Sequence, residues 1–209
     1  KFLPRFGVTA TMVAGTDVAN FEKAIQPNTR VIFLESPNTF TFDLQDIPAI
    51  VKLARQHNII TIIDNSYSTS LGQRCIEMGI DIEVHSASKY YGGHSDVVAG
   101  YVISSQKIIT QIFESEFLNL GGIISPNDAW LLIRSLRTLP LRLQQSRTST
   151  EKIVAWLEKH PQVEKVVYPF SKTFAQYDLA QRQMKHGSGL FTMLIKARDV
   201  EQVELFCNS

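Results

Sequence analysis

Hydrophobic and polar positions along the first hundred residues follow a strand–helix–strand order. Short runs of β-branched and apolar residues at Thr9–Val13, Arg30–Leu34 and Ile59–Asp64 predict strands. Residues 18–25 and 46–57 instead carry apolar side chains three and four positions apart, which predicts two amphipathic helices. This alternation with short connections is typical of a mostly parallel, doubly wound sheet with right-handed crossovers, so the predicted fold class is α/β.

The pattern continues with two further strands, Ile80–His85 and Val97–Ser104, and a helix over Gln106–Phe117. After these, helices are predicted over residues 128–136, 141–159, 176–184 and 199–206, and strands over residues 163–168 and 190–195. The return of strands after a helix-rich stretch predicts two domains. We expect a large domain at residues 1–140 and the start of a smaller C-terminal α/β domain at residues 141–209.

Composition is that of an ordinary globular chain. The 209 residues are 44% hydrophobic and carry a net charge of +1 without a basic stripe or an acidic tail, so we expect no nucleic-acid partner and no membrane partner. No apolar run approaches the length of a membrane span, and no secretion signal opens the chain. Two distant cysteines, Cys75 and Cys207, indicate reduced thiols and a cytoplasmic protein. The five histidines lack the spacing of metal ligands, so no metal site is expected.

The first candidate for chemistry is a lysine in a Ser- and Gly-rich loop. The run Ile80–His85 leads into Ser86, Ser88, Lys89 and Gly92-Gly93. A lysine at the mouth of a buried strand is costly unless it is paired or used, because a desolvated ammonium loses hydration and its pKa falls, as suits a Schiff-base lysine. Short hydroxyls and exposed amides suit a phosphate. The alternative is a solvated loop with a surface lysine.

The second candidate is the acid that ends the run IITIID. In a parallel sheet we expect such a run to be buried on both faces, with Asp64 at the carboxyl end opening onto a ligand crevice. A carboxylate there can keep a pyridine nitrogen protonated while Lys89 holds the aldehyde. That is the division of labour that pyridoxal phosphate requires. The alternative is that Asp64 only caps the turn after the strand.

The stretch DNSYSTSLGQRCIEMGIDIEVHSASKYYGGHSDVVAGYVI, which begins at Asp64, resembles the Cys/Met-metabolism class of fold-type-I pyridoxal-phosphate enzymes. The resemblance implies a transferase-like fold of that type and pyridoxal 5'-phosphate as cofactor. It implies Lys89 as the Schiff-base lysine and Asp64 as partner of the pyridine nitrogen. Ser86 and Ser88 are implied as phosphate contacts, and Ser66 as a hydroxyl near the ring face.

A second element resembles one branch of this family. Residues Glu35 to Thr39 read ESPNT, with Thr39 where the family has an asparagine, a variant associated with the cystathionine β-lyase branch. This implies a carbon–sulfur lyase of methionine biosynthesis and transsulfuration that converts cystathionine to homocysteine, pyruvate and ammonia. Cystathionine γ-lyase, methionine γ-lyase and O-acetylhomoserine sulfhydrylase remain open as alternatives. So does a catalytically dead α/β scaffold.

The resemblance also bears on assembly. It implies a small-molecule amino-acid substrate and a homotetramer built from dimers that share active sites. The family's tyrosine–arginine phosphate contacts would precede Lys1 and its carboxylate-binding arginine would follow Ser209, so we expect an internal segment of a longer enzyme whose large domain lacks its N-terminal part. Four arginines are interpreted as a solvated or interdomain face: Arg134, Arg137, Arg142 and Arg147. Two neighbouring tyrosines, Tyr90 and Tyr91, are interpreted as packing residues or subunit contacts.

Overall fold

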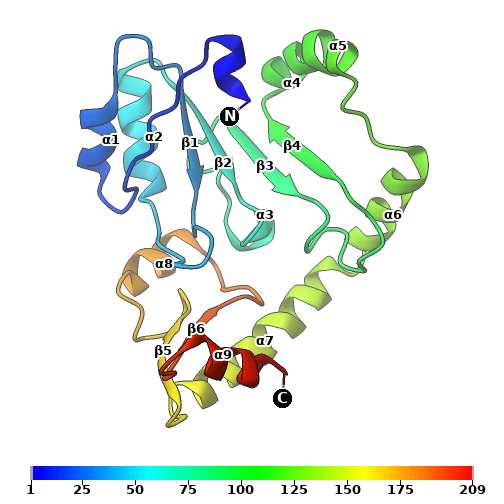
Figure 1. The fold of residues 1–209 in the computed structure, drawn as a ribbon. Helices are drawn as coiled ribbons and strands as arrows, with labels where there is room; N and C mark the ends of the chain where they lie inside the picture. Colours follow the sequence, from blue (N-terminus) through cyan, green and yellow to red (C-terminus); the bar gives the residue numbers. More distant parts are fainter. Residues whose placement is uncertain (1, 209) are drawn as a thin grey trace.

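A four-stranded sheet organises the first half of the chain (Figure 1). The structure is a computed structural model that describes residues 2–208. Its strands are β1 (Val31–Glu35), β2 (Ile60–Asp64), β3 (Ile82–Ser86) and β4 (Gly100–Ser104), in that spatial order. The first three are parallel, and β4 pairs with β3 in the antiparallel direction. The predicted mostly parallel α/β sheet is confirmed.

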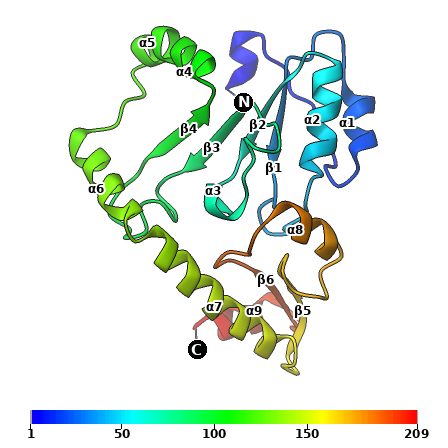
Figure 2. The same ribbon diagram turned by 180° about the vertical axis from the view of Figure 1, so that it is seen from behind.

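Two helices cover one side of the sheet, and Figures 1 and 2 show them side by side. Helix α1 (Val18–Ala24) begins after Asp17, whose carboxylate accepts a hydrogen bond from the Ala19 N–H. Helix α2 (Ile47–Gln56) has the predicted inward face: Ile47, Ile50, Val51 and Ala54 are all buried. These residues pack with the inward side chains of β1 and β2 and form the main core.

The expectation that the strands are buried on both faces is wrong. Ile32, Leu34 and Ile63 are buried, but Phe33, which points to the opposite face, is 61% exposed and Ile60 is 44% exposed. The alternation follows from the twofold period of a strand, since α2 covers only one face within the described residues. The continuous apolar runs therefore form strands that are buried on one face of the sheet only, within the described residues.

Two predicted elements differ. Thr9–Val13 is irregular and largely exposed, because no strand of the described chain pairs with it. The expected helix over Gln106–Phe117 divides into α4 (Gln106–Ile112), a π-helical turn (Phe113–Phe117) and α5 (Leu118–Leu120). A short helix α3 (Thr69–Gly72) and a 3-10 turn (Leu3–Phe6) were not predicted. Both are single turns, too short for a hydrophobic period to be read from the sequence.

The second half of the chain has its own small sheet. Helices α6 (Pro126–Leu136) and α7 (Leu139–Leu157) lead to it. The remaining elements are β5 (Val163–Val167), α8 (Tyr177–Gln183), β6 (Thr192–Ile195) and α9 (Val200–Asn208), with β5 and β6 antiparallel. A separate hydrophobic cluster joins α7 to this sheet. The domain boundary at residues 140/141 stays a prediction.

Helix α8 connects this second part to the first. Within it, the buried Gln183 side chain accepts from the Ile47 N–H at 2.8 Å and donates to the Gln45 carbonyl at 3.0 Å. Just before α8, Gln176 makes the same pair of bonds with the backbone of Leu44, each 2.8 Å long. Gln183 thus gives an acceptor to the first N–H of α2, which has no intrahelical partner, and the two glutamines also satisfy backbone groups of the segment just before this helix.

Candidate cofactor site

The carboxyl ends of β2 and β3 bring three of the predicted residues together. Asp64 is in register with Val84, so Asp64 and Ser86, two positions further along, face the same side of the sheet. One carboxylate oxygen of Asp64, Oδ1, accepts from the Ser66 N–H at 2.9 Å. Ser66 Oγ in turn accepts from the Ser86 N–H at 2.7 Å. The turn after β2 is therefore hydrogen-bonded to the end of β3.

The loop after β3 holds the lysine in a tight backbone turn. The Lys89 N–H donates to the Ser86 carbonyl at 3.1 Å, and the Lys89 carbonyl accepts from the Gly93 N–H at 2.8 Å. Gly93 has φ +69°, a left-handed conformation that favours glycine. The Lys89 side chain itself is exposed. The expectation of a desolvated lysine is wrong for the described chain, because the loop lies at its surface.

Ser88 has a structural partner in the next strand. Its Oγ accepts from the Ala99 N–H at 3.0 Å and donates to the Ala99 carbonyl at 3.3 Å. The Ser88 N–H also donates to the Ala99 carbonyl. These bonds fasten the lysine loop to the chain entering β4. The hydroxyl proton of Ser88 is directed at a carbonyl in this geometry, so its phosphate contact stays a prediction.

An arginine that we interpreted as part of a solvated or interdomain face supports the same loop. Arg142 on α7 donates to the Tyr90 carbonyl at 2.6 Å and to the Ser135 carbonyl at 3.1 Å. Ser135 Oγ donates to the Gly92 carbonyl. Burial lowers the pKa of Arg142. Helices α6 and α7 therefore hold the backbone on the C-terminal side of Lys89.

A buried polar cluster that the sequence analysis missed lies on the opposite face of β3. Glu83 is 1% exposed, and its Oε1 lies 2.6 Å from His85 Nε2. The same oxygen accepts from Asn65 Nδ2 and from Ser70 Oγ, both at 2.8 Å. Burial raises the pKa of a carboxyl group, but here the three hydrogen bonds outweigh it and lower the pKa of Glu83. The available signal was alternation: in IEVHS the residues Glu83 and His85 fall on one strand face.

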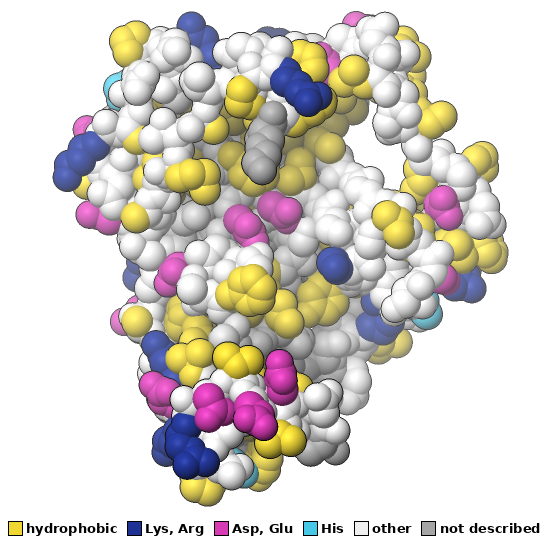
Figure 3. All heavy atoms as spheres, viewed as in Figure 1, with side chains coloured by type: hydrophobic (Ala, Val, Ile, Leu, Met, Phe, Trp, Pro, Cys, Tyr) yellow, Lys and Arg dark blue, Asp and Glu magenta, His cyan; other side chains and the backbone are white. Residues whose placement is uncertain are grey.

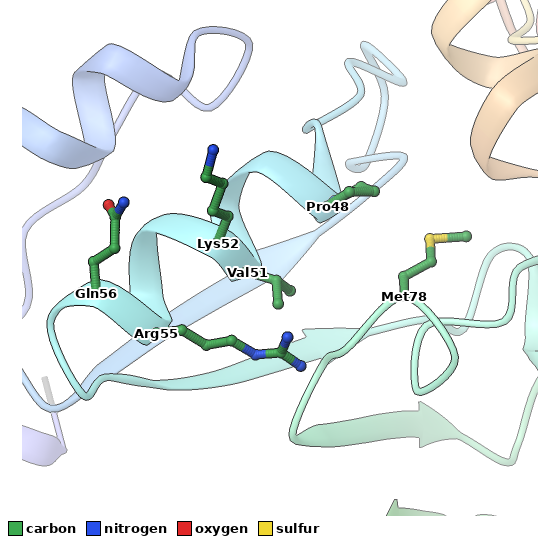
Figure 4. A pocket seen from close by; sticks show the side chains of 6 residues that line it. All are labelled: Pro48, Val51, Lys52, Arg55, Gln56 and Met78. Carbon is green, nitrogen blue, oxygen red and sulfur yellow. The ribbon is translucent and has the colours of Figure 1, made fainter.

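The main pockets lie away from these residues. The larger, of about 460 Å³, is formed by one face of α2 and the loop that carries Met78 (Figure 4). A second, of about 240 Å³, lies between α7 and the segment around His186. Neither contains Asp64 or Lys89, and neither gathers a set of reactive side chains. The candidate site is an open sheet edge in the described part of the chain.

Residues 2–208 contain neither a cluster of metal-ligating side chains nor a membrane-spanning helix. No group of three or more histidine, cysteine, aspartate or glutamate side chains is arranged to hold a metal ion there. Within the same residues, every helix is too short or too polar to cross a membrane.

A parallel α/β sheet with a carboxylate at the end of one strand and a lysine loop after its neighbour is the arrangement that the resemblance to fold-type-I pyridoxal-phosphate enzymes implies. The chain belongs to the Cys/Met metabolism PLP-dependent enzyme family, which it matches over residues 1–209. Similarity to solved structures agrees. The crystal structure of cystathionine γ-lyase from Lactobacillus plantarum, complexed with L-serine, is 36% identical with a TM-score of 0.90, over 93% of this chain and 51% of that one.

Curated relatives have related but different activities. The L-methionine γ-lyase of Treponema denticola is 39% identical over 93% of this chain and 49% of the relative. The cystathionine γ-lyase of Bacillus subtilis is 34% identical over 99% and 54%, and the cystathionine β-lyase of Staphylococcus haemolyticus is 38% identical over 81% and 43%. The chain thus spans about half the length of the curated relatives it matches.

The residues present fit pyridoxal phosphate. Asp64 is half-buried, and within the described residues only its Oδ1 has a hydrogen-bond partner, so Oδ2 can meet a pyridine nitrogen. The exposed Lys89 amine forms no ion pair among the same residues, so it is free to react with an aldehyde. Ser86 faces the Asp64 side of the sheet, where a phosphate would need a hydroxyl.

Proposed function

We propose that the protein to which this chain belongs is a pyridoxal-phosphate-dependent carbon–sulfur lyase of sulfur amino-acid metabolism. The observation that carries the proposal is the pairing of Asp64 and the Lys89 loop at the ends of adjacent parallel strands, joined by the Ser66–Ser86 hydrogen bond. Membership of the family and the C–S lyase activity of the named relatives support it.

Each residue has a distinct role in this proposal. Lys89 Nζ would hold the cofactor through its aldehyde and would act as the base for the proton on the substrate α-carbon. Asp64 Oδ2 holds a proton at the pyridine nitrogen. Ser86 and Ser88 orient the phosphate, and Ser66 lies near the ring face. Bound pyridoxal phosphate supplies the electron sink for the charge left on the α-carbon.

For the substrate we propose cystathionine, cleaved at its β-carbon to homocysteine, pyruvate and ammonia. The sequence around Glu35 supports this choice through its likeness to the β-lyase branch. In the structure Thr39, which replaces the family's asparagine, donates to Glu35 Oε1 at 2.6 Å. Its hydroxyl is therefore used locally. This is the part of the site where the chain departs from the general family pattern.

A second candidate is γ-elimination, favoured by the identity to methionine γ-lyases. The relative from Pseudomonas deceptionensis is 42% identical over 91% of this chain. Such an enzyme would convert methionine to methanethiol, 2-oxobutyrate and ammonia. It needs a second proton transfer, from the β-carbon, which Lys89 would also perform. The alternatives of cystathionine γ-lyase and O-acetylhomoserine sulfhydrylase use the same residues.

Product analysis of the whole protein separates these reactions. With cystathionine, pyruvate plus homocysteine supports β-cleavage, whereas 2-oxobutyrate plus cysteine contradicts it. Methanethiol from methionine would establish the second candidate. A whole protein that binds pyridoxal phosphate, with a visible absorption band, but cleaves none of these amino acids would favour the catalytically dead scaffold.

The role of Lys89 has its own test. Lys89→Ala in the whole protein should reduce turnover by about 10²–10⁴-fold or more, because a general base and the cofactor linkage are both lost. Since the side chain is exposed and the turn is held by backbone bonds, the melting temperature of the cofactor-free protein should not change. A variant that kept more than a few per cent of the wild-type rate would refute the assignment.

We also propose a cytoplasmic homotetramer of dimers. Supporting it, helices α4, α5 and α6 form an arm with hydrophobic side chains along its outer edge, and an opening separates the arm from the sheet (Figure 3). The most exposed are Leu120, Leu118, Ile123, Ile133 and Trp130, each at least 59% exposed. Light scattering of the whole protein tests the assembly, and a monomer would contradict it.

A further inference from the structure

The buried cluster around Glu83 links three loops at the carboxyl ends of the strands. Through Asn65, Glu83 contacts the residue immediately after Asp64. Through Ser70, it reaches the hydroxyl of Tyr91, two residues after Lys89: Tyr91 donates to Ser70 Oγ at 3.1 Å, and the Ser70 N–H donates back to Tyr91 at 3.1 Å. One carboxylate oxygen is therefore connected to both halves of the candidate site.

The third connection reaches the loop after β1. Asn65 donates to the Gln73 carbonyl at 2.8 Å, and Gln73 donates to the Ser36 carbonyl at 2.8 Å. Ser36 follows Glu35, at the strand end beside Asp64. All of these side chains are buried or half-buried, so their hydrogen bonds are not exchanged with water.

Aromatic rings enclose the cluster. Tyr101 from β4 stacks on His85 with ring centroids 4.6 Å apart, and Tyr91 meets both rings edge-on at 4.6–5.1 Å. Because His85 Nε2 faces a carboxylate oxygen, that nitrogen carries the ring proton and donates it. His85 thus supplies a charge-assisted bond that fixes the Glu83 carboxylate in one orientation.

We infer that Glu83 is a positioning residue that fixes the backbone carrying Asp64 relative to the backbone carrying Lys89. The inference rests on the proposed function. Glu83 does not touch the reacting atoms, since it lies on the face of β3 opposite Ser86. A plain structural role would require only that the core be filled. The arrangement found here places a buried charge where it accepts hydrogen bonds from Asn65 and Ser70 of the segment after β2, and Ser70 in turn accepts from Tyr91 of the lysine loop.

The test uses Glu83→Gln in the whole protein with pyridoxal phosphate as probe. The glutamine amide has the shape of the Glu83 carboxylate but lacks its charge, to which His85, Asn65 and Ser70 are hydrogen-bonded. We expect uptake of the cofactor to persist, with a shifted pH midpoint of its visible absorption band. We also expect kcat to fall by roughly 10- to 100-fold with little change in KM, the size expected when reacting groups are misplaced by about 1 Å.

Two controls separate positioning from stability. Glu164→Gln removes an exposed carboxylate on β5 and should change neither the absorption band nor kcat. Val154→Ala truncates a core residue of α7 outside the cluster and lowers the melting temperature without touching the site. If Glu83→Gln lost melting temperature as Val154→Ala does but kept the wild-type kcat and absorption midpoint, Glu83 would be structural only and the inference would be overturned.

A second variant keeps the inference testable if Glu83→Gln does not fold. Tyr91→Phe keeps the ring packing and removes only the hydroxyl that reaches Ser70. By itself it should shift the absorption midpoint and lower kcat with little change in KM, and wild-type values of both would overturn the inference where Glu83→Gln does not fold. Where Glu83→Gln does fold, the effects of the two substitutions on kcat should combine in the double variant to less than their product. Full multiplication would overturn the inference. A wild-type protein that takes up no pyridoxal phosphate would refute the proposed function and this inference together, whereas normal uptake with wild-type behaviour of both variants would refute the inference alone.

Discussion

The hydrogen bond between Ser66 Oγ and the Ser86 N–H makes a quantitative prediction. It joins the turn after β2 to the end of β3 at 2.7 Å, and both residues are half-buried. Ser66→Ala leaves the Ser86 N–H without this acceptor. A buried donor without a partner costs about 1–3 kcal/mol, and half-burial places this one near the lower end, about 1 kcal/mol.

The assay is hydrogen exchange of the peptide that contains Ser86, measured by mass spectrometry on the cofactor-free whole protein. A loss of about 1 kcal/mol in opening free energy speeds exchange by roughly fivefold. We also expect weaker binding of pyridoxal phosphate, because the spacing between Asp64 and Ser86 is set by this bond.

Two matched variants sharpen the result. Ser66→Thr keeps a hydroxyl acceptor and should exchange like the wild type. Ser149→Ala removes a half-buried hydroxyl of α7 that, among residues 2–208, accepts only from the Gln145 side chain, and it should change stability by less than about 0.5 kcal/mol. Unchanged exchange at Ser86 in Ser66→Ala would refute the argument that this hydroxyl ties the two strand ends together.

Three further predictions concern the supports of the site. Arg142→Lys loses the guanidinium fork that joins the Tyr90 carbonyl to the Ser135 carbonyl, so amide exchange in residues 89–93 should rise by about tenfold, equivalent to about 1.4 kcal/mol; unchanged exchange would refute this role of Arg142. Gln183→Ala leaves the Ile47 N–H at the start of α2 without its acceptor and leaves the Gln45 carbonyl only the long 3.5 Å bond from Ser36 Oγ, so it should lower the free energy of unfolding by about 2 kcal/mol in urea titration, whereas a loss below about 0.5 kcal/mol would contradict this. The pKa of Glu83 is lower in the folded chain than its ordinary value of 4.5, so its charge stabilises the fold above that pH, and this contribution disappears as the pH falls through the lowered folded pKa. As the pH falls below about 4.5, the free energy of unfolding should therefore decrease less in Glu83→Gln than in the wild type. The same decrease in both proteins would refute this prediction.

Local pattern predicts much of this fold because the elements around the site are regular. The run that ends at Asp64 and the run that leads to Ser86 are strands because each is short, β-branched and bounded by turn residues. The 3.6-residue period of α2 gives its buried face directly. Parallel pairing of β1 with β2 then follows from the helical connection through α2. Between β2 and β3 only the unpredicted single turn α3 intervenes, so the position of Asp64 near the start of the Lys89 loop follows from the expected parallel sheet as a whole.

The supports of the site could not be predicted in the same way, because they depend on contacts between distant segments. Arg142 reaches Tyr90 across 52 positions of sequence, and Gln183 reaches Ile47 across 136. Neither glutamine nor arginine has a pattern that marks such a role. The false strand at Thr9–Val13 has the same origin: a β-favouring sequence becomes a strand only where a partner edge is available.

These contacts also change how the reactivity of the lysine is explained. The sequence suggests that burial prepares Lys89, but the structure leaves its side chain exposed and fixes the backbone around it. Bonds from Ser88 to Ala99, from Arg142 to Tyr90 and within the turn itself all act on main-chain atoms. The described residues therefore fix the position of the Lys89 main chain, from which the side chain and its amine extend. In the proposed function the lysine would therefore depend first on the position that this loop gives it.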